Sequence, residues 1–226
     1  MNKIRAKINK LSGKTYEDTK ETLKIILDGD ETDFLSDFIK EVFNRAAKDV
    51  LFCSLYAKLL HELAYDHLRK EMRKLFDDYV SVFDEVGKTP DVGTEDYMKF
   101  VEAQDAKRHR KGYSQFISEL VKLGEIEVDL FIKVIQTIVK SLDEIRKVSS
   151  ESNKMLCEEY ADCLKILCIV GSNILKTESS TNEMILILKN MIRKGADAER
   201  PGMSKKAQFA IQDVADLADR GWIPKA

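Results

Sequence analysis

The chain has 226 residues and a formal net charge of −2, so its overall charge gives no general attraction to nucleic acid or anionic membranes. Hydrophobic residues make up 44% and charged residues 34%, with only three prolines, a composition typical of a helical protein in water and not of a disordered one. Residues 1–12 lack the apolar core of a signal peptide, and no apolar run is long enough to span a bilayer. We therefore expect a cytoplasmic or nuclear protein without a membrane segment.

Apolar residues recur at three- and four-residue spacing along most of the chain, which predicts amphipathic helices. Early helices lie around residues 23–27 and 34–43, separated by a turn at Asp28-Gly29-Asp30 with Thr32 as N-cap. From Phe52 to Phe83 the pattern predicts one long or two abutting helices. A loop over 87–94 follows, and further helices are expected over 95–110, 113–123, 128–148, 154–175, 182–193 and 204–219.

These helices predict a repeat architecture. About ten of them in this chain would give antiparallel pairs of roughly 40–47 residues, the period of HEAT-like repeats. We find no convincing strand. We predict an all-α fold, a right-handed solenoid of about five HEAT-like antiparallel helix pairs, with residues 1–226 as a single domain. Such a stack leaves long helical faces exposed, which suits the binding of another protein.

The four cysteines have no spacing typical of a metal or redox site. Cys53, Cys157, Cys163 and Cys168 form no C-x-x-C motif, and each lies in an apolar periodic segment. We expect buried, reduced thiols that act as small hydrophobic residues. No metal and no cofactor is predicted.

Three short motifs approach catalytic patterns, but each lacks a required residue. Gly87-Lys88-Thr89 lacks the first glycine of a phosphate-binding loop, and Pro90 would interrupt the helix after it. His61 and His67 are six residues apart, whereas a zinc protease helix needs histidines at i and i+4. Ser114 lacks the second glycine of a nucleophile elbow and is expected to be an exposed helix residue. We predict that the chain is not an enzyme; the alternative is an active site assembled from residues without recognisable spacing.

Several motifs in chain order resemble the middle domain of eukaryotic translation initiation factor 4 gamma, the scaffold of the cap-binding complex. The matching segments are IRAKINKLS at 4–12 against the family's ILNKLT, VFNRA at 42–46 against IFEKA, Phe52 with Tyr56-Ala57 against F-x-x-x-YA, and FISELVKL at 116–123 against FIGELFKL. The last block, FAIQDVADL at 209–217 followed by WIP at 222–224, resembles FMLQDVLDL and WVP with the same spacing. Because these blocks span nearly the whole chain, the resemblance implies five HEAT repeats in one domain.

The chain also departs from the family pattern. Gly13 and Val50 stand where the family commonly has proline, and Ala207 and Ala210 are smaller than usual. Related middle domains occur in nonsense-mediated decay, splicing, nuclear cap-binding and poly(A)-associated factors, so an RNA-processing or decay factor is the alternative. The block from 212 to 224 favours the initiation-factor branch.

The resemblance implies a scaffold that binds both RecA-like lobes of a DEAD-box RNA helicase of the initiation factor 4A type and stimulates its ATP-dependent RNA unwinding. Carried over by motif position, the helicase contacts would be Ile8, Leu11, Tyr16, Phe52 and Tyr56. Aromatic and aliphatic anchors of this kind supply much of the energy of protein interfaces. The alternative is that these five residues belong to the hydrophobic core.

A basic run is the candidate RNA contact. Lys107, Arg108, Arg110 and Lys111 lie just before the 116–123 block, as an Arg-rich segment does in the family. They could bind RNA phosphates, or they could form a solvated helix end whose cations favour the helix dipole. A third interpretation of the whole chain, RNA binding without a helicase, would need a continuous basic stripe.

The C-terminal part and the tyrosines give two further expectations. Trp222 is more simply a plug for the terminal repeat than a surface anchor. In the family the cap-binding protein is recruited by a Tyr-x-x-x-x-Leu motif, and no tyrosine here has leucine five positions later. Attachment to the cap-binding protein would therefore lie outside these residues or be absent.

Overall fold

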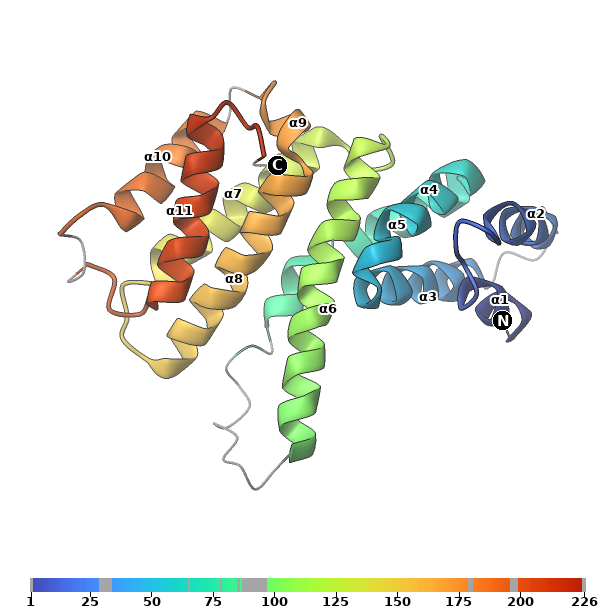
Figure 1. The fold of residues 1–226 in the computed structure, drawn as a ribbon, viewed down its shortest axis with the longest axis horizontal. Helices are drawn as coiled ribbons and strands as arrows, with labels where there is room; N and C mark the ends of the chain where they lie inside the picture. Colours follow the sequence, from blue (N-terminus) through green and yellow to red (C-terminus); the bar gives the residue numbers. More distant parts are fainter. Residues whose placement is uncertain are drawn as a thin grey trace.

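The computed structural model describes residues 2–28, 34–64, 66–77, 79–84, 86, 97–178, 181–195 and 199–224. Within these ranges the chain forms eleven α-helices and two short 3-10 helices, with no strand, so the prediction of an all-α fold is confirmed (Figure 1). The turn predicted at 28–30 with its Thr32 cap and the loop predicted over 87–94 lie wholly or mostly outside the described residues. None of the described helices is long and apolar enough to cross a membrane.

Neighbouring helices pack against each other as α1 with α2, α3 with α4, α7 with α8 and α10 with α11, whereas α5 packs against α3 and α9 is a single helical turn. Helix α6 runs through the middle of the molecule, with α1 to α5 on one side and α7 to α11 on the other (Figure 1). It packs against α3, α4 and α8, while α8 also packs against α7 and α11. The helices are α1 (Asn2–Ile8), α2 (Tyr16–Leu27), α3 (Leu35–Lys48), α4 (Cys53–Leu63), α5 (Asp66–Asp77), α6 (Tyr97–Lys122), α7 (Val128–Ile145), α8 (Glu151–Val170), α9 (Ser172–Leu175), α10 (Thr181–Ile192) and α11 (Lys205–Asp219), with η1 (Val50–Phe52) and η2 (Tyr79–Phe83).

The long apolar pattern that begins at Phe52 resolves into two helices. Helix α4 ends at Leu63 because Ala64 takes an extended conformation with φ −67° and ψ 128°. Helix α5 then begins at Asp66, where the carboxylate favours the positive end of the helix dipole. The first of the two alternatives, one continuous helix, is therefore wrong.

Helix α6 is a single helix of 26 residues, about 39 Å long at 1.5 Å per residue. The prediction of two helices over 95–110 and 113–123 is wrong, because Gly112 stands inside the helix and does not end it. A Cβ atom at Gly112 would lie 1.8 Å from the carbonyl oxygen of Ala47 in α3. The glycine therefore allows α3 and α6 to pack with their backbones in close approach.

One hydrophobic cluster extends through the described helices from Ile4 to Trp222. At its centre, the ring of Phe43 in α3 packs edge-on against Phe116 and Tyr113 in α6, with centroid distances of 4.8 and 5.6 Å. The four cysteines are free and buried, which confirms the expectation of structural thiols. Burial raises the pKa of Cys163 to about 12, so this thiol stays protonated at neutral pH.

Candidate protein-interaction surfaces

Four of the five residues predicted to contact a helicase lie in the hydrophobic core. The exposed fraction is 0% for Ile8, 5% for Leu11, 4% for Tyr16 and 2% for Tyr56. A side chain without exposed surface cannot anchor a partner, so the interpretation of these four as surface contacts is wrong and the core alternative holds for them. Phe52 is the exception, with 37% of its surface exposed.

The buried residues instead join the first two helix pairs. The Tyr56 hydroxyl donates a hydrogen bond of 3.2 Å to the Ile8 carbonyl at the end of α1, which also accepts from the Leu11 amide at 3.1 Å. Tyr16, at the start of α2, lies beneath the ammonium group of Lys58 from α4, whose Nζ is 4.8 Å from the ring centroid. These contacts place Phe52, one helical turn before Tyr56, at the edge of a rigid N-terminal unit.

Three consecutive apolar residues are exposed at the turn between α3 and α4. The exposed fractions are 51% for Val50, 88% for Leu51 and 37% for Phe52. Helix α3 ends at Asp49, whose φ of −116° and ψ of 79° leave the helical region, and the next three residues form η1. Gln115 of α6 fixes the turn by donating a hydrogen bond of 3.3 Å to the Val50 carbonyl. We call Val50, Leu51 and Phe52 the α3–α4 apolar turn.

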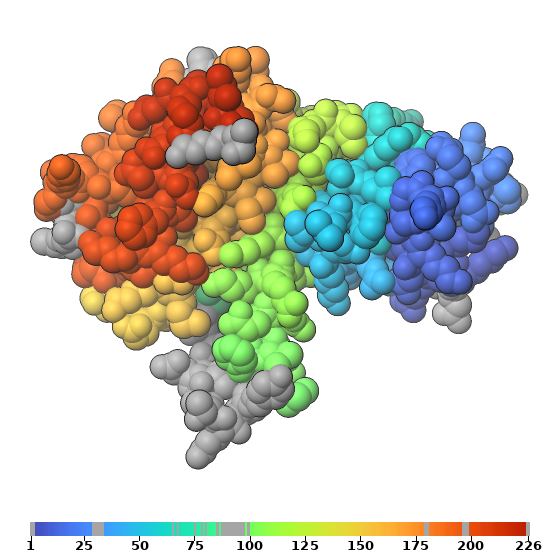
Figure 2. Space-filling model, in the orientation of Figure 1, coloured from blue at the N-terminus to red at the C-terminus, as the bar shows by residue number. Residues whose placement is uncertain are grey.

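Exposed apolar side chains also lie on α8, on α11 and directly after α11, and these two helices lie side by side on the face shown in Figure 2. Ile169 on α8 and Phe209 on α11 are 39% and 70% exposed, and Ile223 after α11 is 60% exposed. We call these three residues and the pocket beside them the α8–α11 groove. The pocket has a volume of about 230 Å³ and is lined by Lys165, Ile169, Asp213, Asp216, Leu217, Arg220 and Pro224.

Residues 221–224, which border this groove, have a defined backbone conformation. Trp222 is 8% exposed and belongs to the hydrophobic cluster, so it is buried and is not a surface anchor. Its backbone amide donates to the Leu217 carbonyl at 2.9 Å, and its φ of 63° lies in the left-handed region that few non-glycine residues adopt. This reversal at Gly221 and Trp222 directs Ile223 to the surface beside α11.

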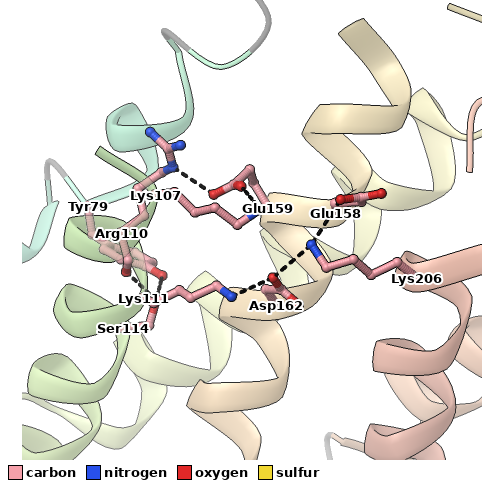
Figure 3. Close-up of polar contacts among 9 residues, drawn as sticks. All are labelled: Tyr79, Lys107, Arg110, Lys111, Ser114, Glu158, Glu159, Asp162 and Lys206. Atoms are coloured by element: carbon pink, nitrogen blue, oxygen red, sulfur yellow. Dashed lines mark hydrogen bonds and ion pairs between the residues drawn. The ribbon is translucent and has the colours of Figure 1, made fainter. Parts of the chain in front are cut away.

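The basic run lies in the middle of α6, and most of its charge is paired with α8 (Figure 3). Lys107 Nζ is 2.7 Å and Arg110 Nε 3.1 Å from the carboxylate of Glu159, and Lys111 Nζ is 2.6 Å from Asp162. The interpretation of the run as a solvated helix end is therefore wrong, since these cations connect two helices. To bind these three cations, an RNA phosphate would have to compete with the carboxylates of α8.

Arg108 is the member of the run that faces solvent. Its side chain is 76% exposed and pairs with Asp105 on the same helix at 2.5 Å. Exposed pairs of this kind contribute little free energy, so Arg108 remains accessible to an anion. One accessible arginine is a much smaller basic surface than the four-residue run that the sequence predicted.

The ion pairs continue from α8 to α11. Lys206 of α11 lies 2.9 Å from Glu158 and 3.5 Å from Asp162. The Ser204 hydroxyl caps α11 by accepting from the Ala207 amide at 3.2 Å, and it also donates to Glu158 at 2.7 Å. We call Lys107, Arg110, Lys111, Glu158, Glu159, Asp162 and Lys206 the α6–α8–α11 ion-pair network.

Two acidic members of this network, Glu158 and Asp162, have lowered pKa values that favour their charged form. Burial alone would raise the pKa of Glu158, but hydrogen bonds from Ser204 and Lys206 outweigh burial and lower it. For Asp162, burial is likewise outweighed by the hydrogen bond from Lys111 and the nearby lysine charges, so its pKa is also lowered.

Ser114 is fully buried, so the prediction of an exposed helix residue is wrong. Its hydroxyl donates to the Arg110 carbonyl at 2.8 Å and lies 2.6 Å from the Tyr79 hydroxyl of η2, from which it accepts (Figure 3). Both hydroxyl groups are buried away from solvent. The role of Ser114 is therefore structural, since this hydrogen bond joins η2 to α6. Within the described part of the chain, no cluster of three or more His, Cys, Asp or Glu side chains could hold a metal ion.

No protein-family model matches the chain, and no curated protein is significantly similar to it. The family resemblance therefore rests on the short ordered motifs. Among the residues that sequence reasoning missed, Val50 and Leu51 carried a signal. Together with Phe52 they form an unbroken apolar run directly after Asp49, which does not fit the spacing of one helix face.

Proposed function

We propose that this chain is a translation initiation scaffold of the initiation factor 4 gamma middle-domain type. It binds both RecA-like lobes of a DEAD-box RNA helicase of the initiation factor 4A type in the cytoplasm and stimulates its ATP-dependent RNA unwinding. The ordered motifs and the four pairs of neighbouring helices that pack together support this proposal, and with it a right-handed HEAT solenoid.

The observation that carries the proposal is the presence of two separate apolar surfaces. The α3–α4 apolar turn lies on one side of α6 and the α8–α11 groove on the other. Exposed apolar side chains of this size commonly mark protein contacts, and a partner with two lobes needs two such surfaces. A rigid α6 between them would set the spacing of the two lobes.

The charge distribution favours a protein partner over direct RNA binding as the main role. Lys107, Arg110 and Lys111 are bound to carboxylates of α8, and Arg108 alone of the run is largely exposed. In this proposal the helicase holds most of the RNA, and the scaffold adds a minor contact through Arg108. The cap-binding protein would attach outside this chain.

The proposal can be tested with variants that remove one surface at a time. Leu51→Ser combined with Phe52→Ser removes the α3–α4 apolar turn without harming the fold, because Phe52 occupies the N-cap position of α4, where serine is favoured. Phe209→Ser removes the most exposed anchor beside the α8–α11 groove. We expect each variant to weaken binding of the full-length helicase by about tenfold or more.

Separate helicase lobes make this test sharper. Each variant should lose binding to one isolated lobe and keep binding to the other, and both should lower the stimulated ATPase rate. Leu186→Ser is the matched control, since Leu186 is 60% exposed but lies on α10, away from both surfaces. Unchanged binding in both surface variants would contradict the assignment of the surfaces. Binding to a splicing or decay helicase in place of the initiation helicase would favour the RNA-processing branch.

A further inference from the structure

A pocket lies at the end of α4 that is remote from the α3–α4 apolar turn. It opens between α5 and the turn that joins α6 to α7, and it has a volume of about 260 Å³. This volume lies below the roughly 300–1,000 Å³ typical of pockets for drug-sized ligands, but it accommodates one large side chain. Its walls are Arg69, Lys70, Arg73 and Phe76 of α5, Gly124, Glu125, Ile126 and Glu127 of the turn, and Leu130 of α7.

One wall of the pocket is held rigidly. The Glu125 side chain is 2% exposed, and its carboxylate lies 2.7 Å from His61 Nδ1 and 3.1 Å from Arg69 Nε. The backbone reverses at Gly124, whose φ is 78°, and the Glu125 amide closes the end of α6 by donating to the Leu120 carbonyl at 3.0 Å. Both carboxylate oxygens of Glu125 take part in these contacts, so its negative charge is neutralised. Glu125 therefore contributes to the shape of the pocket and not to its charge.

The opposite wall carries cations that remain accessible. Lys70 forms no ion pair with any part of the chain that the structure describes, and it is exposed. Arg73 pairs with Glu127 at 2.7 Å, but the two side chains are 53% and 62% exposed. Such an exposed pair is weak, so an incoming carboxylate can replace Glu127 at little cost. Since Arg69 neutralises the buried Glu125, the accessible cations of α5 that line the pocket are Lys70 and Arg73, and they face the single exposed carboxylate of Glu127.

The floor of the pocket is apolar. Phe76 and Ile126 belong to the hydrophobic core and are 2% and 5% exposed, so the apolar surface that a ligand can reach is mainly that of Leu130, which is partly exposed and packs against the same core. An apolar floor beneath a basic rim does not suit a phosphate chain, which would gain nothing from the floor. It suits a peptide that combines an apolar side chain with acidic neighbours.

We propose that this pocket docks an acidic segment of a partner protein, which inserts one apolar side chain against Leu130 and places carboxylates against Lys70 and Arg73. The site is separate from both surfaces of the proposed helicase scaffold. It would therefore allow a second protein to bind while the helicase is held.

The test uses the full chain and fluorescently labelled synthetic peptides, each with a single Leu, Phe or Trp flanked on both sides by Asp and Glu. Peptides flanked by Ser, peptides flanked by Lys, and a single-stranded RNA serve as comparison ligands, with anisotropy as the readout. We expect the acidic peptides to bind at least about tenfold more tightly than the Ser-flanked ones. Tightest binding by the RNA, or equal binding of acidic and Ser-flanked peptides, would overturn the proposal.

Variants locate the binding on the molecule. Lys70→Glu and Arg73→Glu should each weaken acidic-peptide binding by about tenfold, whereas Glu127→Gln should strengthen it because Arg73 is released. Lys74→Glu is the matched control, since Lys74 is on the same helix, is 70% exposed and does not line the pocket. If Lys74→Glu weakens binding as much as Lys70→Glu, the attraction is a general effect of charge and the pocket is not the site. Circular dichroism of each variant verifies that the fold is kept.

Discussion

Phe52 and Tyr56 are spaced at i and i+4, but one is exposed and the other is buried. Tyr56 is buried, and its hydroxyl donates a second hydrogen bond to the Ile8 carbonyl at the end of α1. Burial raises the pKa of Tyr56, with Arg45 acting in the opposite direction, so the hydroxyl stays a proton donor at all moderate pH values. Phe52 lies outside the helix, in η1, with a large part of its ring in solvent. One residue therefore stabilises the fold and the other presents surface.

This division gives a stability prediction. Tyr56→Phe removes one hydrogen bond and should lower the free energy of unfolding by about 1 kcal/mol. Tyr56→Ala removes the buried ring as well and should cost about 3–5 kcal/mol, whereas Phe52→Ala should cost about 1 kcal/mol or less. Urea unfolding followed by circular dichroism measures all three. A loss at Phe52→Ala as large as that at Tyr56→Ala would show that Phe52 belongs to the core.

Sequence spacing predicted that these residues lie together but not which of them is buried. The i, i+4 relation holds for Phe52 and Tyr56 whether or not the helix has begun at residue 52. Where it begins depends on Asp49 leaving the helical region and on Gln115, which lies far along the chain, holding the Val50 carbonyl. These are tertiary effects, so the four buried helicase candidates could not be separated from the exposed one.

At the scale of elements, α6 determines how the two sides of the molecule meet. It packs against α3 through Gly112, where the backbone of Ala47 comes so close that no Cβ atom fits. Glycine has a low helix propensity, and for that reason the sequence favoured a break at this position. A close backbone approach of two helices also requires glycine, and spacing along one chain cannot distinguish the two causes.

Gly112→Ala should therefore destabilise the protein although alanine is the better helix former. Alanine improves helix propensity by about 1 kcal/mol, but separating α3 from α6 costs more, and we expect a net loss of about 2 kcal/mol. The matched control is Gly13→Ala, because a Cβ atom at Gly13 would meet nothing within 4 Å. This control should be neutral or slightly stabilising. Thermal melts of both variants give the comparison, and a stabilised Gly112→Ala protein would contradict the close packing.

Across the whole molecule, the ion-pair network connects α6, α8 and α11. The sequence identified Lys107, Arg110 and Lys111 as a basic run, and it predicted the helices that carry them. It could not identify the partners, because Glu159 and Asp162 are about fifty residues away and nothing in their spacing marks them as facing α6. The residues predicted to bind RNA thus mostly connect helices within the molecule. The all-α fold could be predicted from the sequence because helical periodicity is a local pattern.

The network should make the stability of the protein depend on acid. The pKa values of Glu158 and Asp162 are lower in the folded chain than the value of about 4 that carboxyl groups have when unfolded. The contribution of these two groups to stability is fully present above the unfolded pKa and is lost as the pH falls through the folded pKa, because the unfolded chain then binds more protons.

Glu158→Gln with Asp162→Asn should lower the free energy of unfolding by about 2 kcal/mol at neutral pH, since both groups are only partly buried. The double variant should also show a smaller decline in the free energy of unfolding between roughly pH 5 and pH 2, measured by urea unfolding at each pH. An acid dependence equal to that of the unaltered chain would mean that other carboxylates control it and that the network is not the joint between α6, α8 and α11.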